Sequence, residues 1–297
     1  MTALQLAADP AKISCKVGLS WSTTSFSYGA DTLTNTQAFM SKYFPKITYY
    51  QVQGRNDAAT QSGQIDELVG RGINVLIVSP VDAAAIGSAV DRAIKAGIKV
   101  IASDRNVFSQ GVKTYIGADN VDTGVTAGKY AVQLLSSKGS IIEISGSLGA
   151  SPTIDRAKGF RQAIAGSPDL KIIASQTGNY DQATALKVME DFLQKYRPGS
   201  FQLVFAHGDQ MALGAIQAIK EANRQNEIKV VGVDDSGPAL AAIQAGDYAG
   251  AAAYPLTYQQ HSVAAAKLCA GESVPTRIKM ESALVTKDNA ASFLPGW

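Results

Sequence analysis

Apolar and polar positions divide the chain into two kinds of segment that alternate along its length. Short runs rich in Val and Ile are followed by longer stretches in which apolar residues recur at helical spacing. The interiors of the short runs are almost entirely apolar, which is typical of strands buried on both faces of a sheet. The predicted strands are 16–20, 47–52, 74–79, 99–103, 140–145, 171–176, 202–207 and 229–234, with weaker ones near 114–116, 248–253 and 282–286.

Amphipathic helices fill the intervals between the strands. In the segment 83–97, Ile86, Val90 and Ile94 fall on one face, and Gly97 is suited to end the helix. Repeated strand–helix–strand units predict parallel sheets with helices on both sides. Because the strands are too many for one compact sheet, the pattern predicts an α/β protein built from two similar halves.

Composition narrows the class of protein. The chain has 297 residues, 46% of them hydrophobic, which favours a soluble globular protein with more than one core. The 27 Lys and Arg against 25 Asp and Glu give a net charge of +2, and their dispersed positions predict no nucleic-acid partner. No run approaches the roughly 18 apolar residues of a membrane span. The first ten residues do not resemble a signal peptide, and we expect such a peptide to have been removed.

The inventory of reactive residues is small. The chain has two cysteines, neither in a C-x-x-C pair, and two histidines, His207 and His261, far apart in the sequence. This excludes the usual zinc and thioredoxin-like patterns. No serine elbow, P-loop or His–carboxylate metal set is found. We therefore expect no enzymatic activity, no cofactor and no bound metal.

Polar residues gather where the predicted strands end. The run "VIASDRN" passes from a buried strand directly to Asp104 and Arg105. In parallel α/β sheets, ligands bind beyond the carboxyl ends of the strands. A carboxylate accepts hydrogen bonds from two hydroxyls and a guanidinium donates in a planar fork, while rings such as Trp21, Phe26 and Tyr180 suit the apolar face of a sugar. The pattern favours a cleft for a polyhydroxylated ligand, and an ion pair that only fixes a loop is the alternative for Asp104 and Arg105.

Several segments resemble one known family in order along the chain. "VGLSWSTTSFSYGA", "VIASDRN", "LVFAHGDQMALGAIQAI" and "VVGVDDSGPALAAIQAGDYAG" resemble the type I periplasmic sugar-binding proteins of bacterial ABC transporters, the ribose-binding group in particular. The resemblance implies two Rossmann-like lobes with parallel sheets, joined by three crossing strands at a hinge near Asp119, Tyr254 and Glu281. The implied N-terminal lobe is 1–118 plus 255–281, and the C-terminal lobe is 119–254 plus 282–297.

The resemblance also implies a function. The chain would be a periplasmic monomer, the substrate-binding component of an ABC importer, which binds a monosaccharide or polyol between its lobes. It would close by hinge bending and deliver the ligand to an ABC permease in the inner membrane. The alternatives are a ligand-sensing partner of a chemoreceptor or sensor kinase, and a binder of a different small polar ligand. A lactose-repressor-type DNA-binding regulator is not expected, because the first strand starts near residue 13.

The ligand contacts of the family fall on residues at the strand ends. Ribose binders have Asn-Pro-Phe-Phe where this chain has Thr24–Ser27, so one of the two stacking aromatic rings is missing here. Trp21 or Tyr28 would take its place. They also have polar amides where this chain has Ser79, Gly208 and Tyr254, which leaves the choice among pentoses, hexoses and linear polyols open. The implied ligand-binding residues are Trp21, Thr24, Phe26, Ser79, Asp104, Arg105, Arg156, Tyr180, Asp234 and Tyr254.

Other polar residues have competing interpretations. Asp209 is either a helix N-cap, which we favour, or a ligand contact. His207 is either a ligand contact or a structural histidine, and of Asp234 and Asp235 we expect one to face ligand and one solvent. The segment 54–60 is interpreted as an exposed turn without function, with Asp57 near a helix start.

The two cysteines have a possible common location. Cys15 precedes the first strand and Cys269 ends the predicted helix 257–270. Helices in such layers run back toward the starts of strands, so both thiols can lie at the outer end of the N-terminal lobe. The hypothesis is a disulfide, which an oxidising periplasm allows, and two free thiols are the alternative.

Overall fold

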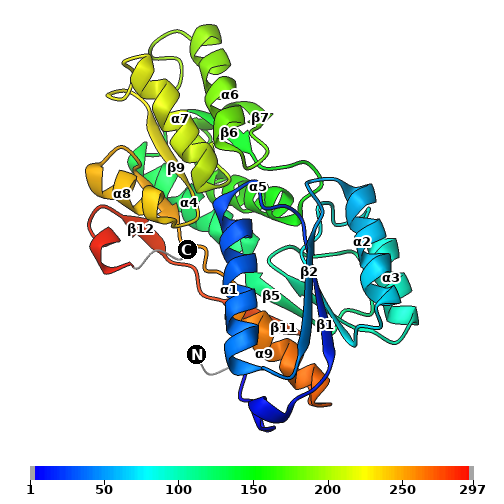
Figure 1. Cartoon of the computed structure of the whole chain (residues 1–297). Coiled ribbons are helices and arrows are strands. Elements are labelled where there is room, and N and C mark those ends of the chain that lie inside the picture. The colour runs from blue at the N-terminus through cyan, green and yellow to red at the C-terminus, as the bar shows by residue number, and fades with distance from the viewer. Residues whose placement is uncertain (1–3, 294–297) are drawn as a thin grey trace. The chain divides into compact units, whose positions relative to one another are not determined.

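The computed structural model describes residues 4–293 and divides into two compact units (Figure 1). Unit 1 comprises Met1–Gly117, Gly149–Ser151 and Leu256–Met280, and unit 2 comprises Ala118–Leu148, Pro152–Pro255 and Glu281–Trp297. Each unit carries its own six-stranded sheet with helices packed on it. The predicted α/β class with two lobes is therefore confirmed, whereas the lobe bounds inferred from the sequence remain a prediction.

The sheet of unit 1 has the strand order β11-β5-β4-β3-β1-β2. Its pairs from β2 to β5 are parallel, so their carboxyl ends meet at one edge. Helices α1 and α9 pack on each other over one face, and α2 and α3 cover the other (Figure 1). The elements are β1 (Lys16–Trp21), α1 (Ser27–Tyr43), β2 (Thr48–Gln53), α2 (Ala58–Gly70), β3 (Val75–Val78), α3 (Gly87–Lys95), β4 (Lys99–Ser103), β5 (Thr114–Ala118), α9 (Tyr258–Cys269) and β11 (Arg277–Met280), with a 3-10 turn at Pro10–Lys12.

The sheet of unit 2 has the order β12-β10-β9-β8-β6-β7. All its pairs are parallel except β10 with β12, which is antiparallel. The elements are α4 (Asn120–Leu134), β6 (Gly139–Ser145), α5 (Ser151–Ile164), β7 (Leu170–Thr177), α6 (Gln182–Lys195), β8 (Leu203–Ala206), α7 (Asp209–Glu221), β9 (Lys229–Val233), α8 (Gly237–Ala245), β10 (Gly250–Ala252) and β12 (Leu284–Thr286), with a 3-10 turn at Ala290–Ser292.

Two elements differ from the sequence prediction. The helix predicted over 83–97 begins only at Gly87, because Asp82 Oδ1 accepts hydrogen bonds from the amides of Ala84 (2.9 Å) and Ala85 (2.7 Å) and forms a turn first. Strand β11 was not predicted, since its residues alternate between exposed and buried and offer no continuous apolar run.

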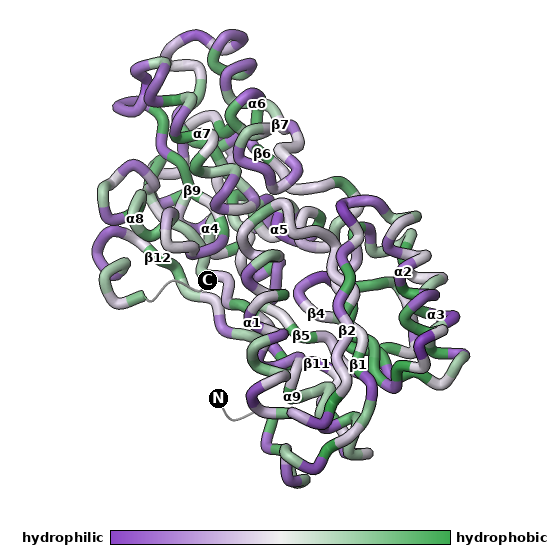
Figure 2. Tube along the Cα trace, in the orientation of Figure 1, coloured by the Kyte–Doolittle hydropathy of each residue, from purple (hydrophilic) through white to green (hydrophobic). Residues whose placement is uncertain are grey.

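The central strands form the cores, as their apolar pattern predicts, whereas the edge strands β2 and β7 are partly exposed and not buried on both faces. All four residues of β3 are buried with no exposed surface. Leu76 and Val78 of this strand pack with side chains of α2, α3 and β4 such as Ile65, Val90 and Val100. In Figure 2 the hydrophobic positions follow strands such as β9, while the hydrophilic ones lie mainly on helix surfaces and loops.

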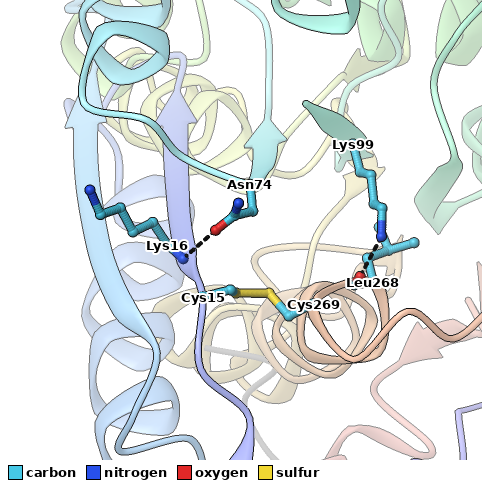
Figure 3. The surroundings of a disulfide bond; sticks show 6 residues. All are labelled: Cys15, Lys16, Asn74, Lys99, Leu268 and Cys269. Atoms are coloured by element: carbon cyan, nitrogen blue, oxygen red, sulfur yellow. Dashed lines mark hydrogen bonds between the residues drawn. A yellow bond between two sulfur atoms is a disulfide. The ribbon is translucent and has the colours of Figure 1, made fainter. Parts of the chain in front are cut away.

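A disulfide joins Cys15 to Cys269 in unit 1, with their Cα atoms 5.9 Å apart (Figure 3). Beside it, the Lys16 amide donates to Asn74 Oδ1 (2.9 Å) and Lys99 Nζ donates to the carbonyl of Leu268 (2.7 Å). These contacts tie the amino-terminal ends of β1, β3 and β4 to the end of α9. The disulfide therefore lies at the opposite edge of the sheet from the carboxyl ends of its parallel strands.

Candidate functional site

The cluster that we call the first half-site consists of Ser79, Asp104 and Arg105, at the carboxyl ends of β3 and β4 in unit 1, and its contact with a ligand stays a prediction. Ser79 Oγ donates a hydrogen bond to Asp104 Oδ2 (3.2 Å), and Arg105 Nε lies 3.8 Å from the same oxygen. The side chain of Arg105 is 3% exposed and that of Asp104 10%. A carboxylate and a guanidinium so deeply buried balance each other's charge within the unit.

The backbone of Asp104 is held in an unusual conformation. Its φ angle is 66°, in the left-handed region that few non-glycine residues adopt. Its amide donates to the carbonyl of Ile116 (2.8 Å), and its own carbonyl accepts from the Tyr115 hydroxyl (2.9 Å). Strand β5 therefore fixes the turn that presents the carboxylate, and such strained residues often cluster at functional sites.

A buried histidine supports the end of β4 directly beneath Asp104. The Thr36 hydroxyl donates to the carbonyl of Thr32 (2.6 Å), so it accepts from His261 Nε2 (2.9 Å). His261 Nδ1 lies 2.9 Å from Ser103 Oγ, and the Ser103 hydroxyl donates to Thr257 Oγ1 (2.9 Å). Burial lowers the pKa of His261 to about 3, so the ring is neutral and structural.

Acid is expected to destabilise unit 1 through His261. Unfolded histidine has a pKa of about 6.5, whereas the folded pKa is about 3. Between these values the unfolded state binds more protons, so the free energy of unfolding falls as the pH is lowered through this window. Urea unfolding of wild type and His261→Gln at several pH values in the window should show a steeper loss for wild type. Equal slopes would contradict this assignment.

The remaining predicted residues of unit 1 lie near the loop after β1. Trp21 is fully buried, with its ring centroid 6.4 Å from that of Tyr28 and 6.4 Å from that of His261. Thr24 and Phe26 are half-buried, and Phe26 takes the N-cap position of α1. A ligand contact of Trp21, Thr24 or Phe26 stays a prediction, and the ring of Trp21 serves the packing of the unit.

The second half-site consists of Arg156, Tyr180, Asp234 and Tyr254 in unit 2. Arg156 extends from α5 with 3% of its side chain exposed, and its Nη2 lies 3.5 Å from Asp234 Oδ1. Its guanidinium carbon lies 4.5 Å from the ring centroid of Tyr254 and 5.9 Å from that of Tyr180. The structure thus gathers the other three residues around the guanidinium of Arg156, in cation–π geometry with both rings.

Asn120 and His207 accept the hydrogen bonds that hold the guanidinium of Arg156 in place. Arg156 Nε donates to Asn120 Oδ1 (2.9 Å), and Nη1 donates to the carbonyl of His207. Asn120 Nδ2 in turn donates to the hydroxyl of Tyr254 (3.3 Å). The sequence pattern missed Asn120, although it follows the end of β5 by only two residues and begins α4.

Two glycines make room for Tyr180. A Cβ at Gly146 would lie 2.1 Å from the Tyr180 ring. A Cβ at Gly208 would lie 3.0 Å from Asp234 Oδ2 and 3.2 Å from the same ring. Ribose binders have a polar amide at the position of Gly208, and the missing side chain here leaves space for Tyr180 and Asp234.

The structure corrects two assignments of acidic residues. Asp235 is buried, and its Oδ1 accepts a hydrogen bond from the Tyr254 amide (3.0 Å), so the expectation that one of the pair faces solvent is wrong. Asp209 is the first residue of α7, and Gly208 is the N-cap. Burial raises the pKa of Asp209 to about 6. Asp234 has a φ angle of 83° and donates its amide to the carbonyl of Ala252 (2.9 Å).

The ring of His207 belongs to a buried network behind Arg156. His207 Nε2 lies 3.1 Å from Glu143 Oε1, and both oxygens of Glu143 accept from Arg161, at 2.9 and 2.7 Å. Burial opposes ionisation of Glu143, but hydrogen bonds from His207 and Arg161 still lower its pKa, and burial lowers the pKa of His207. A neutral His207 paired with a charged Glu143 supports the structural interpretation of this histidine.

Within residues 4–293, no group of three or more His, Cys, Asp or Glu is arranged to hold a metal ion. Over the same range, no helix is both long and apolar enough to cross a bilayer.

Comparison with known proteins places the chain in a family. The model of the periplasmic binding protein domain matches residues 17–271. The xylitol-binding protein of Mycolicibacterium smegmatis is 33% identical over 236 residues, which are 79% of this chain and 67% of that protein. The ribose import binding protein of Haemophilus influenzae is 32% identical over 238 residues, 80% of each chain.

A solved structure agrees with these relatives. The fructose-binding periplasmic domain of a hybrid two-component system superposes with a TM-score of 0.88 at 27% identity, over 94% of this chain and 92% of that one. The family match and both relatives cover most of the chain. The chain therefore belongs to the periplasmic binding protein family, as a type I sugar-binding protein of a group that binds solutes and is not enzymatic.

Proposed function

We propose that the protein is the solute-binding component of an ABC importer and that it binds one neutral monosaccharide or polyol with both half-sites. The observation that carries this proposal is that, in each unit, one arginine pairs with one aspartate that directly follows a strand. Arg105 Nε lies 3.8 Å from Asp104, and Arg156 Nη2 lies 3.5 Å from Asp234. The positive and negative charges of each pair balance, so a charged ligand gains little electrostatic attraction from it. The hydroxyl groups of a neutral ligand can still donate to the carboxylates and accept from the guanidinium groups.

The relatives support the ligand class. Their names give xylitol, ribose and fructose as ligands, and all three compounds are neutral and carry several hydroxyl groups. Tyr180 and Tyr254 would contact the apolar C–H face of such a ligand. Thr24, Phe26 and Trp21 would add contacts from the loop after β1.

Ligand binding would select one conformation. A ligand that contacts both lobes stabilises the closed form, in which both lobes bind it. The protein would reach this form by hinge bending. We propose that the protein acts as a periplasmic monomer and that this form delivers the ligand to the permease in the inner membrane.

The fructose-binding relative favours a second candidate function. That domain belongs to a hybrid two-component system, so the same half-sites would serve a ligand-sensing partner of a sensor kinase or chemoreceptor. Loss of ligand uptake on deletion of the gene supports the importer. Normal uptake with loss of the transcriptional or chemotactic response supports the sensor.

A thermal-shift screen tests the ligand class. Xylitol, ribose, fructose and further pentoses, hexoses and linear polyols are compared with gluconate and glucuronate as charged controls. A ligand at about 100 times its Kd stabilises the folded protein by about 2.7 kcal/mol, and this raises the melting temperature. A shift with neutral compounds alone is the expected result. A shift only with charged compounds, or with other polar solutes, would overturn the proposal.

A further inference from the structure

Gln61 is a buried amide in α2 whose polar groups are all paired. It has no exposed surface, its Nε2 donates to Ser20 Oγ (3.2 Å) and to the carbonyl of Ser79 (3.0 Å), and its Oε1 accepts from the amide of Val81 (2.7 Å). A buried polar group that loses its partner is costly, so these bonds fix the main chain of 79–81 relative to the end of β1.

The loop that Gln61 holds carries the partners of the first half-site. Ser79, held by its carbonyl, donates its hydroxyl to Asp104 Oδ2 (3.2 Å). The carbonyls of Pro80 and Val81 each accept from Arg105 Nη1 at 3.3 Å. Both charged residues of the half-site therefore bind a loop that Gln61 ties to α2, and the Ser79 amide also ties this loop to β1 through the carbonyl of Ser20 (2.9 Å).

The local backbone is built to bring Gln61 to this loop. Asp57 is the N-cap of α2 and accepts from the Thr60 amide (2.7 Å), which places Gln61 in the first turns of the helix. A Cβ at Gly54 would lie 2.9 Å from Gln61 Cβ and 3.2 Å from Val81 Cγ2. The close approach of α2 to the loop thus depends on a glycine, in a segment interpreted from the sequence as a turn without function.

We propose that Gln61 is a positioning residue for ligand binding: it sets the places of Ser79 and of the carbonyls that hold Arg105, and it contacts no ligand itself. The inference rests on the proposed function, since it assigns Gln61 to the same half-site. The competing role is purely structural, in which Gln61 only contributes to the packing of α2.

Gln61→Glu and Gln61→Leu separate these roles. In Gln61→Glu, a protonated carboxyl group donates to the Ser79 carbonyl and accepts from Val81 as the amide does, whereas an ionised carboxylate faces the Ser79 carbonyl with a negative charge. Burial raises the pKa of such a carboxyl, so Gln61→Glu should bind ligand about tenfold more weakly than wild type at about pH 8 and approach wild type at about pH 5. Gln61→Leu should be weak at both pH values.

Calorimetry with xylitol, ribose and fructose measures these affinities, and two controls accompany it. Leu68 lies on the same helix as Gln61, and its buried side chain packs against Gly18. Leu68→Ala removes this packing, so the variant should lose stability and keep wild-type affinity for ligand. Asp104→Ala tests the half-site itself. If Asp104→Ala weakens binding while both Gln61 variants bind like wild type at both pH values, the positioning role is overturned.

A readout without ligand keeps the inference testable if none of these three compounds binds or if Asp104→Ala binds normally. Normal binding by Asp104→Ala would count against the proposed function, whereas another neutral compound that binds would replace the three in these titrations. In Gln61→Leu, the Val81 amide should exchange hydrogen faster relative to the amides of β3, and the NMR resonance of Arg105 Nε should shift. Leu68→Ala should show neither change. Unchanged Val81 exchange and Arg105 resonance in Gln61→Leu would overturn the positioning role independently of any ligand.

Discussion

Replacing Arg156 with methionine is expected to destabilise unit 2 and to abolish ligand binding. The substitution leaves the Asp234 carboxylate without a guanidinium that lies 3.5 Å away, and it removes the donors to Asn120 and to the carbonyl of His207. Breaking a buried ion pair by removing one partner costs about 3–5 kcal/mol. Methionine keeps an unbranched apolar stem, so the change acts mainly through the lost charge and hydrogen bonds.

Urea unfolding and calorimetry on Arg156→Met test this expectation. Arg156→Lys is the matched control, because it retains the charge near Asp234 but cannot donate in a fork to several acceptors at once. It should lose less stability than Arg156→Met while still binding ligand weakly. A fully stable Arg156→Met variant with wild-type affinity would refute the description of the second half-site.

Removing the disulfide with Cys15→Ser and Cys269→Ser together is expected to lower the free energy of unfolding of unit 1 by about 2–5 kcal/mol. The bond joins residues 254 positions apart, so it restricts a long loop of the unfolded chain. Urea unfolding without reductant, followed by probes in each unit, measures the loss. Unit 2 should unfold as in wild type.

Two further measurements test whether the disulfide affects ligand binding and whether the two thiols are bonded. The bond lies beside the amino-terminal ends of β1, β3 and β4, so the double variant should bind ligand with wild-type affinity under native conditions (Figure 3). Denatured wild-type protein without reductant should show no reactive thiol. Two titratable thiols, or a double variant as stable as wild type, would contradict the assignment.

Much of the fold follows from the apolar pattern. Strand β4 (Lys99–Ser103) has the predicted bounds, and the ends of β1 and β9 differ from prediction by one residue. These strands are buried on both faces, so nearly every residue in them must be apolar or small. Such a continuous run of apolar and small residues can be recognised in the sequence. Strand β11 alternates between exposed and buried residues, and so short an alternating run gives no comparable signal.

The candidate site is predictable where its residues follow strands directly. Asp104 and Arg105 stand out because a buried strand ends in two charges, and the structure brings them to Ser79. Gln61 lies on a helix, and its role depends on contacts with Ser79 and Val81 that are distant in sequence. Asp235 was misplaced for the same reason, since its partner is the main chain of Tyr254.

We propose that both half-sites bind the same ligand molecule, and calorimetric titration of wild type, Asp104→Ala and Asp234→Ala tests this claim. Each titration uses the neutral compound that gives the largest thermal shift. The claim predicts one ligand per wild-type chain and an affinity about 10- to 100-fold weaker in each variant, because each loses charged hydrogen bonds to hydroxyl groups. Wild-type affinity in either variant, or two independent ligands per chain, would contradict it.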